Sequence, residues 1–124
     1  MGLKTLFFDS YAFFEIAKGN PNYENVSKGI AIVTTRLNLM EFYYGILVFE
    51  GVDRADEHYD KLVKFAVDIE DEIIKEAMQF RASKKNKNLS YVDCIGYVIA
   101  LKNNIRFLTG DEQFRDLKNV EFIK

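Results

Sequence analysis

The sequence has 124 residues, a length typical of one domain, and its 48% hydrophobic content is enough for a packed core and excludes a disordered chain. The formal net charge of −2 gives no sign of nucleic-acid binding through bulk positive charge, although a local basic patch would suffice. Cys94 is the only cysteine, which excludes an intramolecular disulfide and favours a reducing cytoplasm as the location.

Five short apolar runs predict β-strands, and helical patterns lie between them. The strands are expected at 5–8, 30–33, 65–68, 105–108 and 120–123. The helices are expected at 10–18 with Ser10 as N-cap, 36–50 with Thr34 or Thr35 as N-cap, 52–64, 71–83, and 90–101 with Ser90 as N-cap. Alternation of strands and helices predicts an α/β fold, here one domain over 1–124 built as a three-layer α/β/α sandwich with a central, mostly parallel sheet.

Two of the expected helices, 36–50 and 90–101, are apolar around most of their circumference. Such a helix is buried within its own chain or is covered in part by a partner chain. We expect Tyr43, Tyr44 and Phe49 to lie in the core, with part of that surface covered by a second copy or another protein. Residues 94–101 form the longest apolar run, which is too short to span a bilayer, so no membrane association is expected.

Four acidic residues interrupt these apolar segments. Asp9 and Asp111 directly follow strands, Asp93 lies in the first turn of one apolar helix, and Glu41 lies on the polar stripe of the other. Ligands of open α/β sheets bind at the carboxyl ends of the strands. Because buried carboxylates must be paired or bind a cation, we expect the four to meet around a divalent ion. A set of oxygen ligands suits Mg²⁺ or Mn²⁺.

Each acid also has a purely structural interpretation. Asp9 would serve as a helix cap, and Glu41 would face solvent on a helix that is less buried than it looks. Asp93 would be the capping-box partner of Ser90, and Asp111 would be a turn residue. Capping and metal binding are compatible, so these alternatives do not exclude a site.

The order and spacing of the acidic segments resemble the PIN-domain family, in particular small VapC-like toxins of toxin–antitoxin pairs. The resemblance covers essentially the whole chain and is carried by segments 7–10 (FFDS), 38–45 (NLMEFYYG), 90–95 (SYVDCI), 107–114 (FLTGDEQF) and 120–122 (VEF). The segment 94–96 departs from the family pattern, because it is less rich in alanine than is usual there.

The resemblance implies a metal-dependent endoribonuclease that uses Mg²⁺ or Mn²⁺, acts on RNA, forms a homodimer and is inhibited by a cognate antitoxin. By position, the implied catalytic and metal-binding residues are Asp9, Glu41, Asp93 and Asp111. Residues expected to support the carboxylates or to contact phosphate are Ser10, Thr109, Asn38 and, less directly, Asp116, whose spacing varies in the family.

A basic segment after the fourth predicted helix is the best local candidate for contact with an RNA backbone, which requires cations. Its members are Arg81, Lys84, Lys85 and Lys87. The alternative is a solvated loop with no partner.

Three other functions are compatible with parts of the pattern. The Asp9 and Asp111 segments resemble two motifs of haloacid-dehalogenase-like phosphatases. That family needs an acid two residues after the first aspartate, where this chain has Tyr11. A response-regulator receiver would use Asp68 and a lysine after the last strand, for which only Lys124 is present. The third alternative is a PIN-like module that binds RNA or a protein without cleavage.

Overall fold

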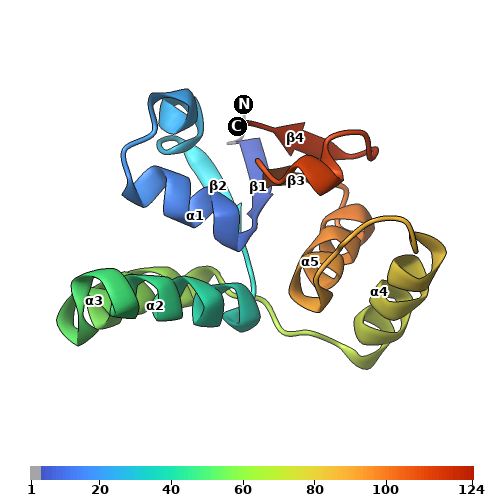
Figure 1. Ribbon diagram of the computed structural model, residues 1–124, viewed down its shortest axis with the longest axis horizontal. Helices are drawn as coiled ribbons and strands as arrows, with labels where there is room; N and C mark the ends of the chain where they lie inside the picture. Colours follow the sequence, from blue (N-terminus) through green and yellow to red (C-terminus); the bar gives the residue numbers. More distant parts are fainter. Residues whose placement is uncertain (1–3) are drawn as a thin grey trace.

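The computed structural model describes residues 4–124 and has a central sheet of four strands (Figure 1). The strands are β1 (Lys4–Phe8), β2 (Ile30–Val33), β3 (Arg106–Thr109) and β4 (Val120–Phe122). Their order across the sheet is β2-β1-β3-β4, and every pair is parallel. The predicted α/β fold with a parallel sheet is therefore confirmed.

Within residues 4–124, five α-helices and three 3₁₀ turns surround the sheet. The helices are α1 (Ser10–Ala17), α2 (Arg36–Glu50), α3 (Val52–Leu62), α4 (Asp71–Ser83) and α5 (Tyr91–Lys102). The 3₁₀ turns are η1 (Pro21–Val26), η2 (Val63–Phe65) and η3 (Glu112–Phe114). In Figure 1, α1, α2 and α3 lie on one side of the sheet, and α4 and α5 lie on the other.

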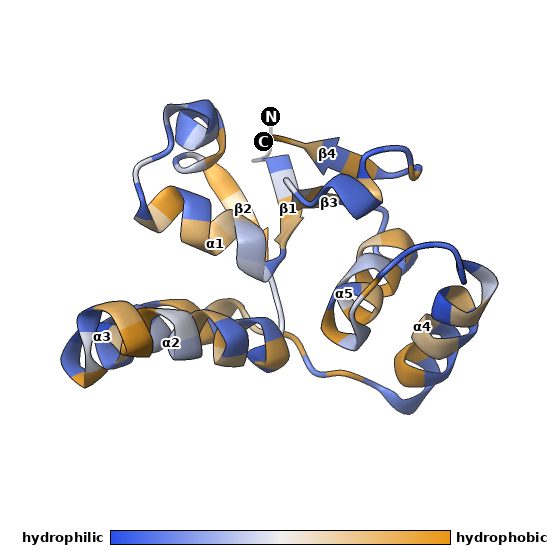
Figure 2. Cartoon of the chain, in the orientation of Figure 1, coloured by the Kyte–Doolittle hydropathy of each residue, from blue (hydrophilic) through white to orange (hydrophobic). Residues whose placement is uncertain are grey.

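Alternation along β1 separates two hydrophobic cores, because successive side chains of a strand point to opposite faces. Phe7 points to the α4–α5 side and stacks on Phe107, with 5.7 Å between ring centroids. Leu6 and Phe8 point to the side of α1, α2 and α3. In Figure 2 the strand β2 is largely orange, that is apolar, while β1 begins with pale or blue polar residues and ends in orange ones. The sheet is thus buried on both faces, and its functional surface is left at the ends of the strands.

Two local predictions were wrong. Residues 65–68 do not form a strand, because only Ala66 makes a bridge, to Thr34, at the end of β2. Ser10 is not the N-cap of α1, because the Asp9 side chain occupies that position and accepts from the Ala12 N–H. The first correction leaves the sheet one strand smaller, and the second frees the Ser10 hydroxyl for another contact.

The two apolar helices differ in burial. Residues 94–100 of α5 are all buried, as the sequence pattern predicts. On α2, by contrast, Tyr44 is 68% exposed and Phe49 is 86% exposed, so the expectation that these two side chains lie in the core was wrong. Within the part of the chain that the structure describes, no helix is long and apolar enough to cross a membrane.

Candidate functional site

Asp9, Glu41, Asp93 and Asp111 line one pocket of about 700 Å³ at the carboxyl edge of the sheet. They come from four segments of the chain, namely the end of β1, the middle of α2, the first turn of α5 and the loop after β3. The other lining residues are Ser10, Tyr11, Phe14, Met40, Tyr44 and Ser90. The pocket therefore has an acidic floor and a wall that is largely aromatic or apolar.

Asp9 and Asp111 are held at the ends of two hydrogen-bonded strands. The Asp9 N–H donates to the Leu108 carbonyl at 3.3 Å, and this bond joins the ends of β1 and β3. Asp9 Oδ1 accepts from the Ala12 N–H at 2.8 Å, and Asp111 Oδ1 accepts from the Gln113 N–H at 2.9 Å. Asp9 is thus the helix cap that its structural interpretation expects, and Asp111, expected as a turn residue, caps the 3₁₀ turn η3. Each cap fixes the direction of its carboxylate.

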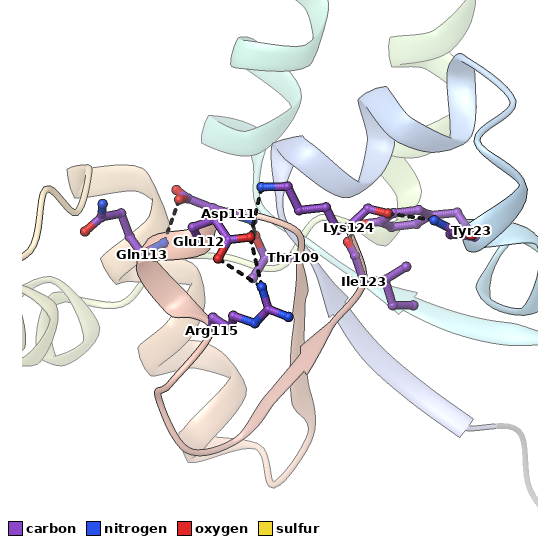
Figure 3. Close-up of polar contacts among 9 residues, drawn as sticks. Tyr23, Thr109, Asp111, Glu112, Gln113, Arg115, Ile123 and Lys124 are labelled. Atoms are coloured by element: carbon purple, nitrogen blue, oxygen red, sulfur yellow. Dashed lines mark hydrogen bonds and ion pairs between the residues drawn. The ribbon is translucent and has the colours of Figure 1, made fainter.

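The loop that carries Asp111 is tightly packed. A methyl group on Gly110 would collide with the Tyr11 ring and with the Ile123 carbonyl, so glycine is required there by close approach. Figure 3 shows Glu112 joined to Arg115 and Lys124 beside Asp111. These contacts fix the loop after β3 against the end of β4.

A chain of hydrogen bonds through buried side chains ends on Glu41. The Thr35 hydroxyl donates to Asn38 Oδ1 at 2.6 Å, and the Asn38 amide donates to Ser10 Oγ at 3.4 Å. Ser10 Oγ donates in turn to Glu41 Oε1 at 2.6 Å, which is shorter than its 3.2 Å separation from the Asn38 carbonyl. Because the hydroxyl has one proton, we assign it to the shorter contact. The chain orients the Glu41 carboxylate and stabilises its charge.

The carboxylates disfavour one another's charge. Burial, followed by the nearby charge of Asp93, holds the pKa of Asp9 well above its usual range, although the Thr109 hydroxyl and the Ala12 N–H lower it. Burial also raises the pKa of Asp93 to about 6, with smaller contributions from the charges of Glu41 and Asp111 and an opposing one from Ser90. Asp9 is only 2% exposed, so water cannot screen this repulsion.

The donor set fits a hard divalent cation in its chemistry, since it consists of oxygen ligands only. Among residues 4–124, however, no three histidine, cysteine or acidic side chains lie close enough together to form a complete metal site. Two carboxylates 4 Å apart repel by roughly 4 kcal/mol at an effective dielectric constant near 20. Carboxylates that repel in this way are expected to move closer only when a cation lies between them.

Some predicted residues lie outside this pocket. Asp116 is exposed, forms an ion pair with Lys87 at 2.7 Å and lines a different cavity together with Lys84. Arg81 donates through Nε to the Leu89 carbonyl at 2.8 Å, and its guanidinium carbon lies 4.7 Å from the centre of the Tyr91 ring. The basic segment precedes the residues that lead into α5, and its neighbour Asn88 donates through its N–H to Gln113 Oε1 at 3.1 Å, beside the loop that carries Asp111.

Sequence reasoning missed two contributors to the pocket. Thr35 was expected only as a cap of α2, and it does cap that helix, but its hydroxyl also begins the chain of hydrogen bonds to Glu41. Tyr11 was noted only because it stands where a haloacid-dehalogenase-like phosphatase needs an acid. In the structure its ring lines the pocket and packs on Gly110. Helical spacing placed Asn38 on one stripe with Glu41, but no sequence signal linked Thr35 to the site.

Several solved structures with the same fold are described as toxins or toxin–antitoxin complexes. The sarcin–ricin loop cleaving toxin VapC20 of Mycobacterium tuberculosis has a TM-score of 0.77 at 17% identity, over 96% of this chain and 99% of that one. A toxin–antitoxin complex from Klebsiella pneumoniae gives 0.74 at 15% identity, over 94% and 95%. VapBC2 of Rickettsia felis, bound to a DNA fragment from its promoter, gives 0.70 at 16% identity, over 97% and 99%.

No curated protein sequence matches this chain. The family comparison is positive, because the PIN domain matches residues 6–120, which is nearly the whole chain. The match includes all four acidic segments, the strands that carry Asp9 and Asp111, and both apolar helices. The chain therefore belongs to the PIN-domain family.

Proposed function

We propose that this protein is a metal-dependent endoribonuclease, the toxin of a toxin–antitoxin pair, which hydrolyses RNA phosphodiester bonds. The observation that carries the proposal is the meeting of four acids from four segments in one pocket of a PIN-domain chain. The similar toxin VapC20 is described as cleaving the sarcin–ricin loop, which is RNA chemistry on the same fold. The pocket opens at the strand ends, where ligands of such sheets bind.

Asp9, Glu41, Asp93 and Asp111 would hold Mg²⁺ or Mn²⁺. When bound, the cation would lower the pKa of a water molecule and stabilise negative charge on the phosphate. Ser10 keeps the Glu41 carboxylate oriented toward the pocket through its 2.6 Å hydrogen bond. The fully buried Thr109 hydroxyl accepts from the Asp111 N–H at 3.1 Å, a bond within the end of β3, and the same hydroxyl lowers the pKa of Asp9 through a hydrogen bond.

The other enzyme classes receive less support. A phosphatase of the haloacid-dehalogenase type needs an acid at position 11, where the Tyr11 ring fills space against Gly110. A receiver needs Asp68 at the acidic edge, but Asp68 lines a separate pocket together with Val67 and Glu70. The charged residues required by both alternatives are therefore absent from the pocket.

A protein partner is supported by the exposed apolar face of α2, defined here as Met40, Tyr44, Val48 and Phe49. Contiguous exposed apolar surface of this kind marks interaction sites. Met40 and Tyr44 also line the acidic pocket, so a protein bound to this face would cover the pocket. We therefore propose a cognate antitoxin as one partner and a second copy of the chain as another, in the cytoplasm.

The test is cleavage of labelled cellular RNA in Mg²⁺ or Mn²⁺ by matched variants. Asp9→Asn should lower cleavage by more than about a hundredfold, beyond the loss typical of outer ligand contacts, while Ser10→Ala should lower it by about tenfold. Asp116→Asn is the control, because this acid lies outside the pocket. Circular dichroism establishes that each variant is folded.

Undiminished cleavage by folded Asp9→Asn would refute the proposal. RNA binding without any cleavage by the wild type would favour the non-catalytic module.

A further inference from the structure

Two of the four acids of the pocket stand on segments that belong to different elements of the fold. Asp111 is the N-cap of the 3₁₀ turn η3, and Asp93 lies in the first turn of α5. Both line the acidic pocket. The distance between their carboxylates therefore depends on how the loop after β3 is held against the segment that leads into α5.

Gln113 joins these two segments, although it is not among the residues that line the pocket. Its side-chain Oε1 accepts from the Asn88 N–H at 3.1 Å, and its own N–H donates to Asp111 Oδ1 at 2.9 Å. One residue thus holds the Asp111 carboxylate through its backbone and reaches the segment before α5 through its side chain. We call these two hydrogen bonds the Gln113 bridge.

The Asn88 end of the bridge is fixed. The next residue, Leu89, is buried, and its carbonyl accepts from Arg81 Nε at 2.8 Å. Ser90 then caps α5, because its Oγ accepts from the Asp93 N–H at 3.0 Å. The Asn88 N–H is therefore a fixed point against which the loop after β3 is placed relative to Asp93.

The turn that carries Asp111 does not need the Gln113 side chain for its own fold. Backbone bonds close η3, among them the 2.9 Å bond from the Phe114 N–H to the Asp111 carbonyl, and the buried Phe114 ring anchors the turn in the core. The ion pair of Lys87 with Asp116 also joins the two segments, but Asp116 is exposed, and exposed ion pairs contribute little. The Gln113 side chain is thus left with one role, the contact with Asn88.

We propose that Gln113 is a positioning residue, which sets the separation of Asp111 from Asp93 and so prepares the pocket for a divalent cation. The proposal rests on the proposed metal-dependent function and adds a residue outside the four acids on which cation binding depends. Loss of a hydrogen-bonding contact behind a metal-binding side chain typically lowers metal affinity by about 10–100-fold. Removal of the bridge should therefore weaken cation binding while the protein stays folded.

The test measures the binding of Mn²⁺ by electron paramagnetic resonance, with no RNA present. Gln113→Met keeps the length of the side chain but removes the acceptor, so it should weaken Mn²⁺ binding by about tenfold. Gln113→Glu keeps an acceptor oxygen for the Asn88 N–H and should bind Mn²⁺ at least as tightly as the wild type. Asn88→Ala is the matched control, because the bond uses the backbone N–H, and it should bind Mn²⁺ as the wild type does.

A second measurement needs no metal. Nitrogen-15 relaxation should show lower backbone order parameters for residues 111–113 in Gln113→Met, because the loop has lost its contact with the segment before α5. The order parameters of α5 should stay unchanged, since its residues 94–100 are buried. Asp116→Asn breaks only the exposed ion pair and should leave both regions as they are in the wild type. Circular dichroism establishes that each variant is folded.

Three outcomes separate this inference from the proposed function. Unchanged Mn²⁺ affinity in folded Gln113→Met overturns the positioning role, and RNA cleavage by the wild type would leave the nuclease intact. Equal losses of affinity in Gln113→Met and Gln113→Glu would show that the acceptor oxygen is not responsible, which also overturns the role. Weaker Mn²⁺ binding in Gln113→Met that Gln113→Glu restores, in a protein that never cleaves RNA, supports the bridge and overturns the nuclease.

Discussion

Helices α2 and α5 have the same sequence character but different surroundings. Both are apolar around most of their circumference, and each carries one acid of the pocket, Glu41 on α2 and Asp93 on α5. Yet α5 has an unbroken run of seven buried residues, 94–100, whereas α2 buries only Asn38, Leu39, Phe42 and Ile46. An apolar circumference therefore does not show that a helix is buried within its own chain.

The reason for the difference lies in the layers. Helix α5 lies between the sheet and α4, so one face contacts Phe7 and Phe107 and the other contacts α4. Helix α2 lies at the margin of the fold, where its neighbours are α1 and α3. Its remaining side faces outward next to the pocket. The interior helix thus serves stability, and the marginal helix keeps an exposed apolar side, the surface proposed above for a partner.

The largest expected effect comes from a matched pair of glycines, one in each helix. Gly96→Ala on α5 should lower the free energy of unfolding by about 3 kcal/mol, because its new methyl group meets the buried Phe7 ring. The methyl group of Gly45→Ala on α2 meets only the tip of the Phe14 ring, which borders the pocket and can move. This substitution also adds up to about 1 kcal/mol of helix propensity, so its loss of stability should be smaller. Urea unfolding followed by circular dichroism measures both. Equal losses would contradict the proposed difference between the two helices.

The second effect concerns the acids that the two helices carry. The pKa of Asp93 is raised to about 6, so the native protein takes up this proton at a pH where the unfolded chain, with a pKa near 3.8, does not. The protein without metal should therefore become more stable as the pH falls from about 6 toward 3.8, by roughly 1.4 kcal/mol for each pH unit in that window. Thermal unfolding in EDTA at several pH values measures this.

Two variants isolate the contribution of Asp93. Asp93→Asn should reduce the pH dependence and leave the part that comes from Asp9, whose pKa is also raised, while Glu41→Gln should leave most of it. Burial lowers the pKa of His58, which acts in the opposite direction over the same range, but it cancels in the comparison with the wild type. A slope in Asp93→Asn equal to that of the wild type would show that the buried charge lies elsewhere, on Asp9 for example.

Residue pattern was sufficient for the parallel sheet and the helices, since strand and helix periods differ and each run has clear ends. It failed at 65–68, where an apolar run has the composition of a strand but only Ala66 reaches the sheet edge. Adjacent Asp9 and Ser10 are equally good caps, so the choice between them depends on where β1 ends. Pattern alone could not settle this.

The site was less predictable than the fold. Pattern indicated that the four acids would share one edge, and they line one pocket, but their roles stay predictions. The contact of Thr35 with Asn38 and the stacking of Arg81 on Tyr91 depend on side-chain positions that only the folded chain defines. Asp116 has a suitable residue type and spacing, yet its partner is Lys87, because the loop turns it outward.

The smallest effect on stability is expected on the exposed face of α2. The double variant Val48→Asp/Phe49→Ser should change the free energy of unfolding of the isolated chain by less than about 0.5 kcal/mol, because neither side chain packs in the core. If this face binds a second copy, sedimentation equilibrium should give a dimer for the wild type and a monomer for the variant. Val98→Ala on α5 is the control, since it removes buried methyl groups and should cost about 1–2 kcal/mol without altering association. A variant that stays dimeric would show that the two copies meet elsewhere, and the apolar face of α2 would then be left to the antitoxin.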